Sequence, residues 1–131
     1  MTMTVQRRSL LGGLAGAVLA RPGFAQAWPS RPIRMAVGYS PGGGNDLIAR
    51  IVAARLQETL GQTALVDNKP GAQSIVAAEL VAKAPADGYT LLVAPSGPMT
   101  INPAVYAKLP YAPERDFAPI SLLAEFPLLL V

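Results

Sequence analysis

The amino-acid sequence predicts an α/β protein built on a parallel sheet. Three times along the chain, a short apolar run is followed by a loop of small residues and then by a segment whose apolar side chains have helical spacing. Strands that alternate with helices of this length form βαβ units, in which the strands are parallel. Right-handed crossovers place the strand-to-helix loops at one edge of the sheet, its carboxyl edge, where open α/β sheets bind ligands.

The first unit contains the most informative loop of the chain. An apolar strand is expected at 33–37, and it ends at Gly38. The loop 39–46 holds three consecutive glycines and leads into a helix expected over 46–60, which Gly61 should end in the left-handed conformation. Apolar residues recur at intervals of three and four along this helix, so one face should pack on the sheet. These residues are Leu47, Ile48, Ile51, Val52, Leu56 and Leu60.

The chemistry of this loop suits a small anion. Glycines allow positive φ angles and a close approach of the backbone to a ligand. The first N–H groups of the following helix have no partner inside it, and they lie at the positive end of its dipole. Asn45 or Asp46 could instead cap the helix, so the same residues also fit a strand-to-helix turn without a ligand.

Two further units repeat the pattern. Their expected segments are a strand at 63–66, a loop at 67–74, a helix at 75–83, a strand at 89–94 and a loop at 95–100. Asn102 is the expected N-cap of a short last helix, with Pro103 as its first residue. Three loops of small residues should therefore meet at the carboxyl edge, which favours a binding site over a simple turn.

Residues 1–27 have the layout of an export signal. Arg7 and Arg8 form a basic front, an uncharged run occupies 9–20, and an A-x-A cleavage site ends at Ala27. The arginine pair resembles a twin-arginine signal, and ordinary Sec export is the alternative. The apolar run is shorter than the about 20 residues that a membrane-spanning helix needs.

Composition excludes several classes of function. Three of the eleven basic residues lie in the signal, which leaves eight basic and eight acidic side chains and no basic patch for nucleic acid. The chain has no Cys and no His, so it lacks thiol chemistry, His-dependent triads and most zinc sites. We therefore predict no catalytic residue, no metal and no cofactor.

An ordered series of motifs resembles the periplasmic solute-binding proteins of tripartite tricarboxylate transporters, the Bug or TctC-like family. The resemblance covers nearly all of the chain after the signal. Its motifs are Trp28-Pro29-Ser30-Arg31-Pro32-Ile33, Pro41-Gly42-Gly43-Gly44-Asn45-Asp46 with Ala49-Arg50, Leu60-Gly61-Gln62, Val66-Asp67-Asn68-Lys69-Pro70-Gly71-Ala72, Ala82-Lys83-Ala84, Asp87-Gly88-Tyr89-Thr90-Leu91-Leu92, Ile101-Asn102-Pro103, Leu109-Pro110-Tyr111 and Asp116-Phe117-Ala118-Pro119-Ile120.

The resemblance implies a two-lobed, venus-flytrap receptor. Such a protein is a periplasmic monomer that closes on a small organic acid and delivers it to membrane permease subunits, or to a membrane sensor. On this basis residues 28–119 form the first lobe, and the apolar stretch 120–131, in which we expect a strand at 120–125, begins a crossover toward a second lobe beyond this truncated chain.

The resemblance also implies a set of ligand-binding residues. Family members hold a ligand carboxylate with loop N–H groups, hydroxyls and water. A carboxylate beside an anionic ligand is unfavourable, so Asp46 is expected to cap the helix or hold water. Many family members have further glycines and an Asn where this chain has Gln73, Ser74 and Ile75. The implied binding residues are Ser40, Gly42, Gly43, Gly44, Asp46, Gly71, Ala72, Gln73, Ser74, Ser96 and Gly97.

The alternative from another class is an exported α/β enzyme that binds a nucleotide or another phosphate-bearing ligand with its glycine-rich loop. The chain contains no G-x-G-x-x-G spacing, no P-loop lysine and no G-x-S-x-G elbow. An exported protein also has little access to ATP. The sequence therefore favours the receptor.

Overall fold

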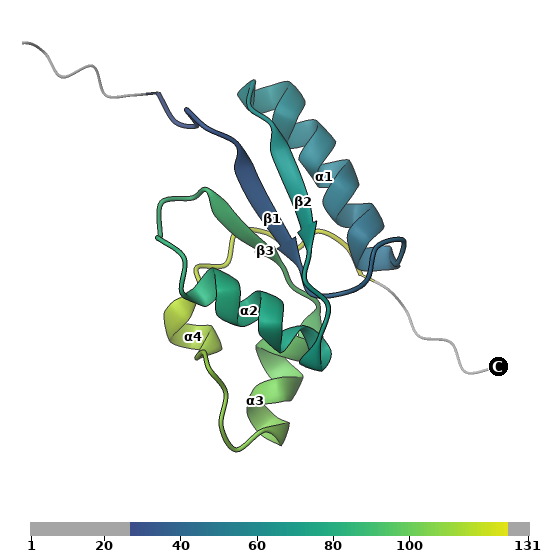
Figure 1. Ribbon diagram of the computed structural model, residues 1–131, viewed down its shortest axis with the longest axis vertical. Helices are drawn as coiled ribbons and strands as arrows, with labels where there is room; N and C mark the ends of the chain where they lie inside the picture. Colours follow the sequence, from purple (N-terminus) through teal and green to yellow (C-terminus); the bar gives the residue numbers. More distant parts are fainter. Residues whose placement is uncertain (1–26, 126–131) are drawn as a thin grey trace, which may run out of the picture.

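The computed structural model describes residues 27–125, and its centre is a sheet of three parallel strands (Figure 1). The strands are β1 (Ile33–Val37), β2 (Ala64–Asn68) and β3 (Thr90–Val93), in the order β2-β1-β3. Met35 of β1 is in register with Val66 on one side and Leu91 on the other. The predicted parallel α/β fold is confirmed. Residues 1–26, which hold nearly all of the predicted export signal, and the apolar run 126–131 lie outside the described residues.

Helices cover both faces of this sheet. Strands β2 and β3 lie on opposite sides of β1. Right-handed crossovers then place the helix between β1 and β2 on one face of the sheet and the helix between β2 and β3 on the other. The helical segments are α1 (Gly44–Leu60), η3 (Ala72–Ser74), α2 (Ile75–Ala82), η4 (Gly97–Ile101), α3 (Asn102–Val105) and α4 (Pro113–Asp116). Within residues 27–125, no helix is long and apolar enough to cross a membrane.

The core lies between α1 and the sheet. Met35, Val37 and Val93 of the strands pack against Ala49 and Ala53 of α1. The predicted helix is confirmed, and Gly61 ends it at φ 67° as expected. Its buried face is centred on alanines, however, which allow a close approach of helix to sheet. Two residues expected on that face are exposed instead, Leu47 at 60% and Ile51 at 57%.

Three expectations about the later part of the chain are wrong. Residues 97–101 form the helical turn η4 and not an open loop. Asn102 has helical angles, φ −59° and ψ −40°, so it continues that turn and does not cap α3. Residues 120–125 form no strand, and Ile120 and Leu122 are 80% and 74% exposed, because no strand of the described part of the chain pairs with them.

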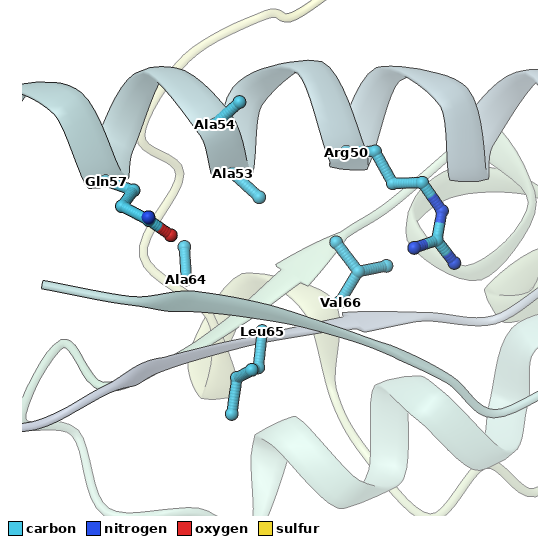
Figure 2. A pocket seen from close by; sticks show the side chains of 7 residues that line it. All are labelled: Arg50, Ala53, Ala54, Gln57, Ala64, Leu65 and Val66. Atoms are coloured by element: carbon cyan, nitrogen blue, oxygen red, sulfur yellow. The ribbon is translucent and has the colours of Figure 1, made fainter.

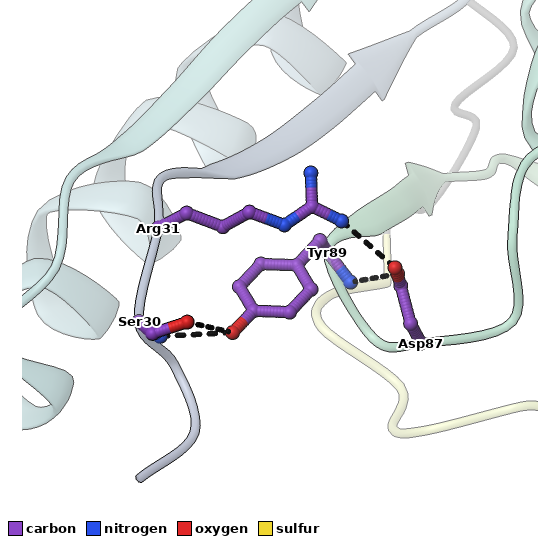
Figure 3. A network of polar contacts seen from close by, with 4 residues as sticks. All are labelled: Ser30, Arg31, Asp87 and Tyr89. Atoms are coloured by element: carbon purple, nitrogen blue, oxygen red, sulfur yellow. Dashed lines mark hydrogen bonds and ion pairs between the residues drawn. The ribbon is translucent and has the colours of Figure 1, made fainter. Parts of the chain in front are cut away.

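The amino edge of the sheet is closed by a polar and aromatic network (Figure 3). The Tyr89 hydroxyl accepts a hydrogen bond from the Ser30 N–H (2.8 Å) and lies 3.2 Å from its Oγ. Arg31 stacks over the Tyr89 ring at 4.1 Å and forms an ion pair with Asp87 at 2.8 Å. The segment before β1 is therefore fastened to the segment before β3.

Candidate functional site at the carboxyl edge of the sheet

The three predicted loops converge at the carboxyl edge. Since β1 is parallel to both neighbours, the loops after all three strands start at the same edge (Figure 1). Contacts join them directly: the Asn68 side chain donates to the Tyr39 carbonyl (3.1 Å), and the Asn102 side chain donates to the Gln73 carbonyl (3.2 Å). Two glycines also lie where loops meet. A β carbon added to Gly38 would contact Ser74, and one added to Gly97 would contact Tyr39.

The first loop exposes backbone N–H groups at the start of α1. Gly42 has φ 88°, which only glycine adopts at little cost, whereas Gly43 is extended at φ −82° and ψ 172°. Among residues 27–125, the N–H groups of Gly44, Asn45 and Asp46 have no acceptor in the helix, because the first helical bond is donated by Leu47 to the Gly43 carbonyl (3.0 Å). Such a cluster at a helix N-terminus suits a small oxyanion.

Asp46 is the buried carboxylate that holds this loop in shape. Its side chain is 4% exposed, and one oxygen accepts hydrogen bonds from the Gly42 N–H and the Arg50 Nε, each at 2.9 Å. The other oxygen accepts a bond from the Asn68 side chain at 3.0 Å. The hydrogen bonds from Arg50, Gly42 and Asn68 lower the pKa of Asp46 to about 2. The carboxylate is therefore charged, and both of its oxygens accept hydrogen bonds from the protein itself.

Asp46 does not cap α1 through the usual N-cap position. The N-cap residue is Gly43, and no side chain bonds to the first N–H groups of the helix. Asp46 is the third helical residue and reaches back to the Gly42 N–H, one position before the cap. This arrangement leaves the helical N–H groups free while neutralising part of the helix dipole.

The second loop contains a left-handed turn made of residues other than glycine. After Gly71 at φ 142°, Ala72, Gln73 and Ser74 have φ 45°, 50° and 70°. L-residues adopt such angles at a cost of about 1–2 kcal/mol each. The turn places the Ser74 hydroxyl, fully buried and without a hydrogen-bond partner among the described residues, against Gly38.

The third loop lies beside the second. Ser96 is exposed, and its carbonyl accepts a hydrogen bond from the Thr100 hydroxyl at 2.7 Å. A β carbon placed on Gly97 would lie 3.6 Å from the Tyr39 hydroxyl and 4.0 Å from the Gln73 carbonyl oxygen. Asn102 is fully buried beneath this junction. Gly97 is therefore the point where all three loops meet.

The implied binding residues differ in their exposure to solvent. Two are buried, Asp46 and Ser74, and Gly97 is partly buried. The sequence did not indicate that Gly38, Asn68 and Asn102 join the loops: Gly38 was expected only to end the first strand, and Asn102 only to cap the last helix. The remaining residues are exposed at the carboxyl edge: Ser40, Gly42, Gly43, Gly44, Gly71, Ala72, Gln73 and Ser96.

A separate groove of about 390 Å³ lies between α1 and β2 (Figure 2). Its lining is dominated by small and apolar side chains such as Ala53, Ala64 and Val66, while Leu65 points to the other face of the strand. Arg50 at its rim is already paired with Asp46. Arg50 is the one cation among the seven described residues that line the groove. The groove therefore offers a ligand no unpaired cation.

A parallel sheet with glycine-rich loops converging at its carboxyl edge defines the chain as a ligand-binding α/β lobe. Residues 48–131 match the family described as the tripartite tricarboxylate transporter family receptor, TctC. The chain therefore belongs to this family of solute-binding receptors, as the motifs predicted. The family is non-enzymatic, which excludes the nucleotide-binding enzyme considered above.

Individual relatives support the assignment. A UPF0065 protein from Pseudomonas sp. strain P51 is 42% identical over 130 residues, which are 97% of this chain and 38% of the relative. Protein BugT of Bordetella pertussis is 40% identical over 119 residues, which are 90% of this chain and 36% of BugT. The chain thus spans less than two fifths of the length of these relatives.

Solved structures show the same fold. The chain superposes on MatC of Rhodopseudomonas palustris with bound malate at a TM-score of 0.70 and 38% identity, covering 73% of this chain and 33% of MatC. The R. palustris protein Rpa4515 with adipate gives a TM-score of 0.63 and 42% identity, covering 66% of this chain and 29% of that protein. Both neighbours hold a small dicarboxylate.

Proposed function

We propose that this chain belongs to an exported receptor that captures a small carboxylate-bearing solute at the carboxyl edge of its sheet. The observation that carries the proposal is the cluster of unpaired N–H groups from Gly44, Asn45 and Asp46 at the start of the 17-residue helix α1. Aligned backbone donors and the helix dipole both favour a carboxylate there. Malate in MatC and adipate in Rpa4515 are ligands of the same chemical class.

The receptor would deliver its solute to the membrane subunits of a tripartite transporter. This step rests on the family, whose description names that transporter. The export signal predicted at 1–27 supports a periplasmic location, with cleavage after Ala27. A membrane sensor is the alternative receiver, and the site chemistry is the same for both.

Thermal unfolding in the presence of candidate solutes tests the proposal. The purified protein should melt at a higher temperature with at least one small organic acid from a panel of mono-, di- and tricarboxylates, because a ligand that binds only the folded state stabilises it. NAD and ATP should have no effect. Stabilisation by a nucleotide and by none of the acids would contradict the proposal.

A further inference from the structure

We propose that Gln73 is a specificity-determining residue, whose carboxamide hydrogen bonds an oxygen of the solute beyond the carboxylate held at the start of α1. The inference rests on the proposed function and deepens it. The solute class that follows is a small carboxylate with a second hydrogen-bonding oxygen, either a hydroxyl or another carboxylate.

The backbone of Gln73 provides the first argument. Gln73 has φ 50° and ψ 47°, inside the left-handed turn that also contains Ala72 and Ser74. Glycine adopts these angles without the steric penalty that a β carbon introduces. This position therefore carries a long polar side chain, although glycine would adopt the same backbone conformation with less strain. Strain of this kind concentrates at ligand-binding sites, where the side chain contributes to function.

The position of Gln73 provides the second argument. Its carbonyl oxygen accepts a hydrogen bond from the fully buried Asn102 (3.2 Å) and lies 4.0 Å from the β position of Gly97. The Tyr39 hydroxyl of the first loop lies on the same glycine at 3.6 Å. The backbone of Gln73 is thus fixed at the junction of the three loops, so its side chain starts from a defined point at the carboxyl edge of the sheet.

The chemistry of the side chain provides the third argument. Gln73 is exposed, and within residues 27–125 its carboxamide makes no hydrogen bond. The loops 39–45, 70–74 and 94–101 contain no Lys or Arg. A neutral carboxamide offers N–H donors and an oxygen acceptor, so it can bind a hydroxyl or a carboxylate without charge repulsion. It gives no such bond to an alkyl end, which creates selectivity.

Calorimetric titration of matched solutes tests the inference. The probes are butyrate, 4-hydroxybutyrate and succinate, together with hexanoate, 6-hydroxyhexanoate and adipate. The wild-type protein should prefer the members with a distal oxygen by about fivefold or more, the value of one hydrogen bond. In Gln73→Gly this preference should fall to about one, the affinity for the plain acid should remain, and the melting temperature should rise as the turn relaxes.

Ala72→Gly is the matched control, because Ala72 shares the left-handed conformation and has no polar group. It should raise the melting temperature and leave the ranking of solutes unchanged. If Gln73→Gly keeps the wild-type preference, or weakens all probes equally, Gln73 does not select the solute, although solute binding stands. If the wild-type protein binds none of the six acids, the inference fails together with the proposed function for this class.

Discussion

Asp46 is a single residue on which the shape of the anion site depends. Its hydrogen bonds from Arg50, Gly42 and Asn68 lower its pKa from 3.8 to about 2. A carboxylate whose pKa is lower in the folded state contributes stability that is fully present above its unfolded pKa. This contribution should disappear as the pH falls from about 4 to about 2. Urea unfolding between pH 6 and pH 2 measures the decline.

Asp46→Asn removes the titrating group and should make that decline shallower, while lowering stability at neutral pH. The loop should also loosen, because the Gly42 N–H would lose its charged acceptor. Identical slopes for wild type and Asp46→Asn would show that Asp46 is not the titrating group.

Gly38 is required for a different reason, which is space. A β carbon at Gly38 would lie 1.6 Å from the Ser74 Oγ and 2.7 Å from the Ser74 Cα. Gly38→Ala should therefore cost about 3 kcal/mol or more of unfolding free energy, at the upper end for overpacking. Chemical denaturation measures this value. Ser74→Gly in the same protein should restore only part of it, because the backbone at position 74 would still crowd the added methyl group.

Gly43→Ala is the control for Gly38→Ala. The nearest atom to a β carbon at Gly43 is the Ser40 carbonyl oxygen at 3.8 Å, and φ is −82°. The change should alter the unfolding free energy by no more than about 0.5 kcal/mol, as at other open positions. Equal losses for Gly38→Ala and Gly43→Ala would contradict the packing argument.

The sequence predicts the glycine-rich loop but not the role of each glycine in it. Three glycines in a row suggested positive φ in general, and only Gly42 among Gly42, Gly43 and Gly44 has it. Likewise, a buried partner for Gly38 could not be foreseen, because Ser74 is brought there by the left-handed turn. Such roles depend on contacts between loops that are distant in sequence, and local patterns carry no information about these contacts.

At the scale of elements, the spacing of apolar residues predicts helix α1 correctly, but the face that packs on the sheet differs from the predicted one. Ala49 is completely buried and Leu47 is 60% exposed, because alanines fill the helical spacing on the side nearest the sheet. Ala49→Leu should cost about 1–3 kcal/mol by overpacking. Leu47→Gln should change stability by no more than about 0.5 kcal/mol. Denaturant unfolding of both variants decides this, and a larger loss for Leu47→Gln would contradict the observed orientation.

The three strand–helix units were predictable because hydrophobic spacing and turn residues agree in each of them. Strand 33–37 and the end of the first helix at Gly61 match the structure. The third loop and the segment 120–125 were not predictable. The former becomes helical through packing on the second loop, to which Asn102 bonds, and the latter lacks a partner strand among the described residues. Apolar composition alone does not supply that partner.

At the scale of the whole molecule, the two edges of the sheet have different tasks. The amino edge is closed by Ser30, Arg31, Asp87 and Tyr89 (Figure 3), while the carboxyl edge presents unpaired backbone donors. The strands between them are short, with five, five and four residues, yet they separate the two groups of loops. Stability and solute binding should therefore respond to different substitutions.

Two variants test this separation. Tyr89→Phe removes the hydroxyl that bonds to Ser30, so the melting temperature should fall while the affinity for the solute stays constant. Gly43→Val places a branched side chain over the open N–H groups, and its extended backbone accepts valine, so affinity should fall at least about tenfold with little change in melting temperature. Both quantities are measured on the same preparations, by calorimetric titration and thermal unfolding. Because valine at position 43 adds bulk without removing any hydrogen bond of the fold, unchanged affinity would mean that the solute does not lie over the start of α1.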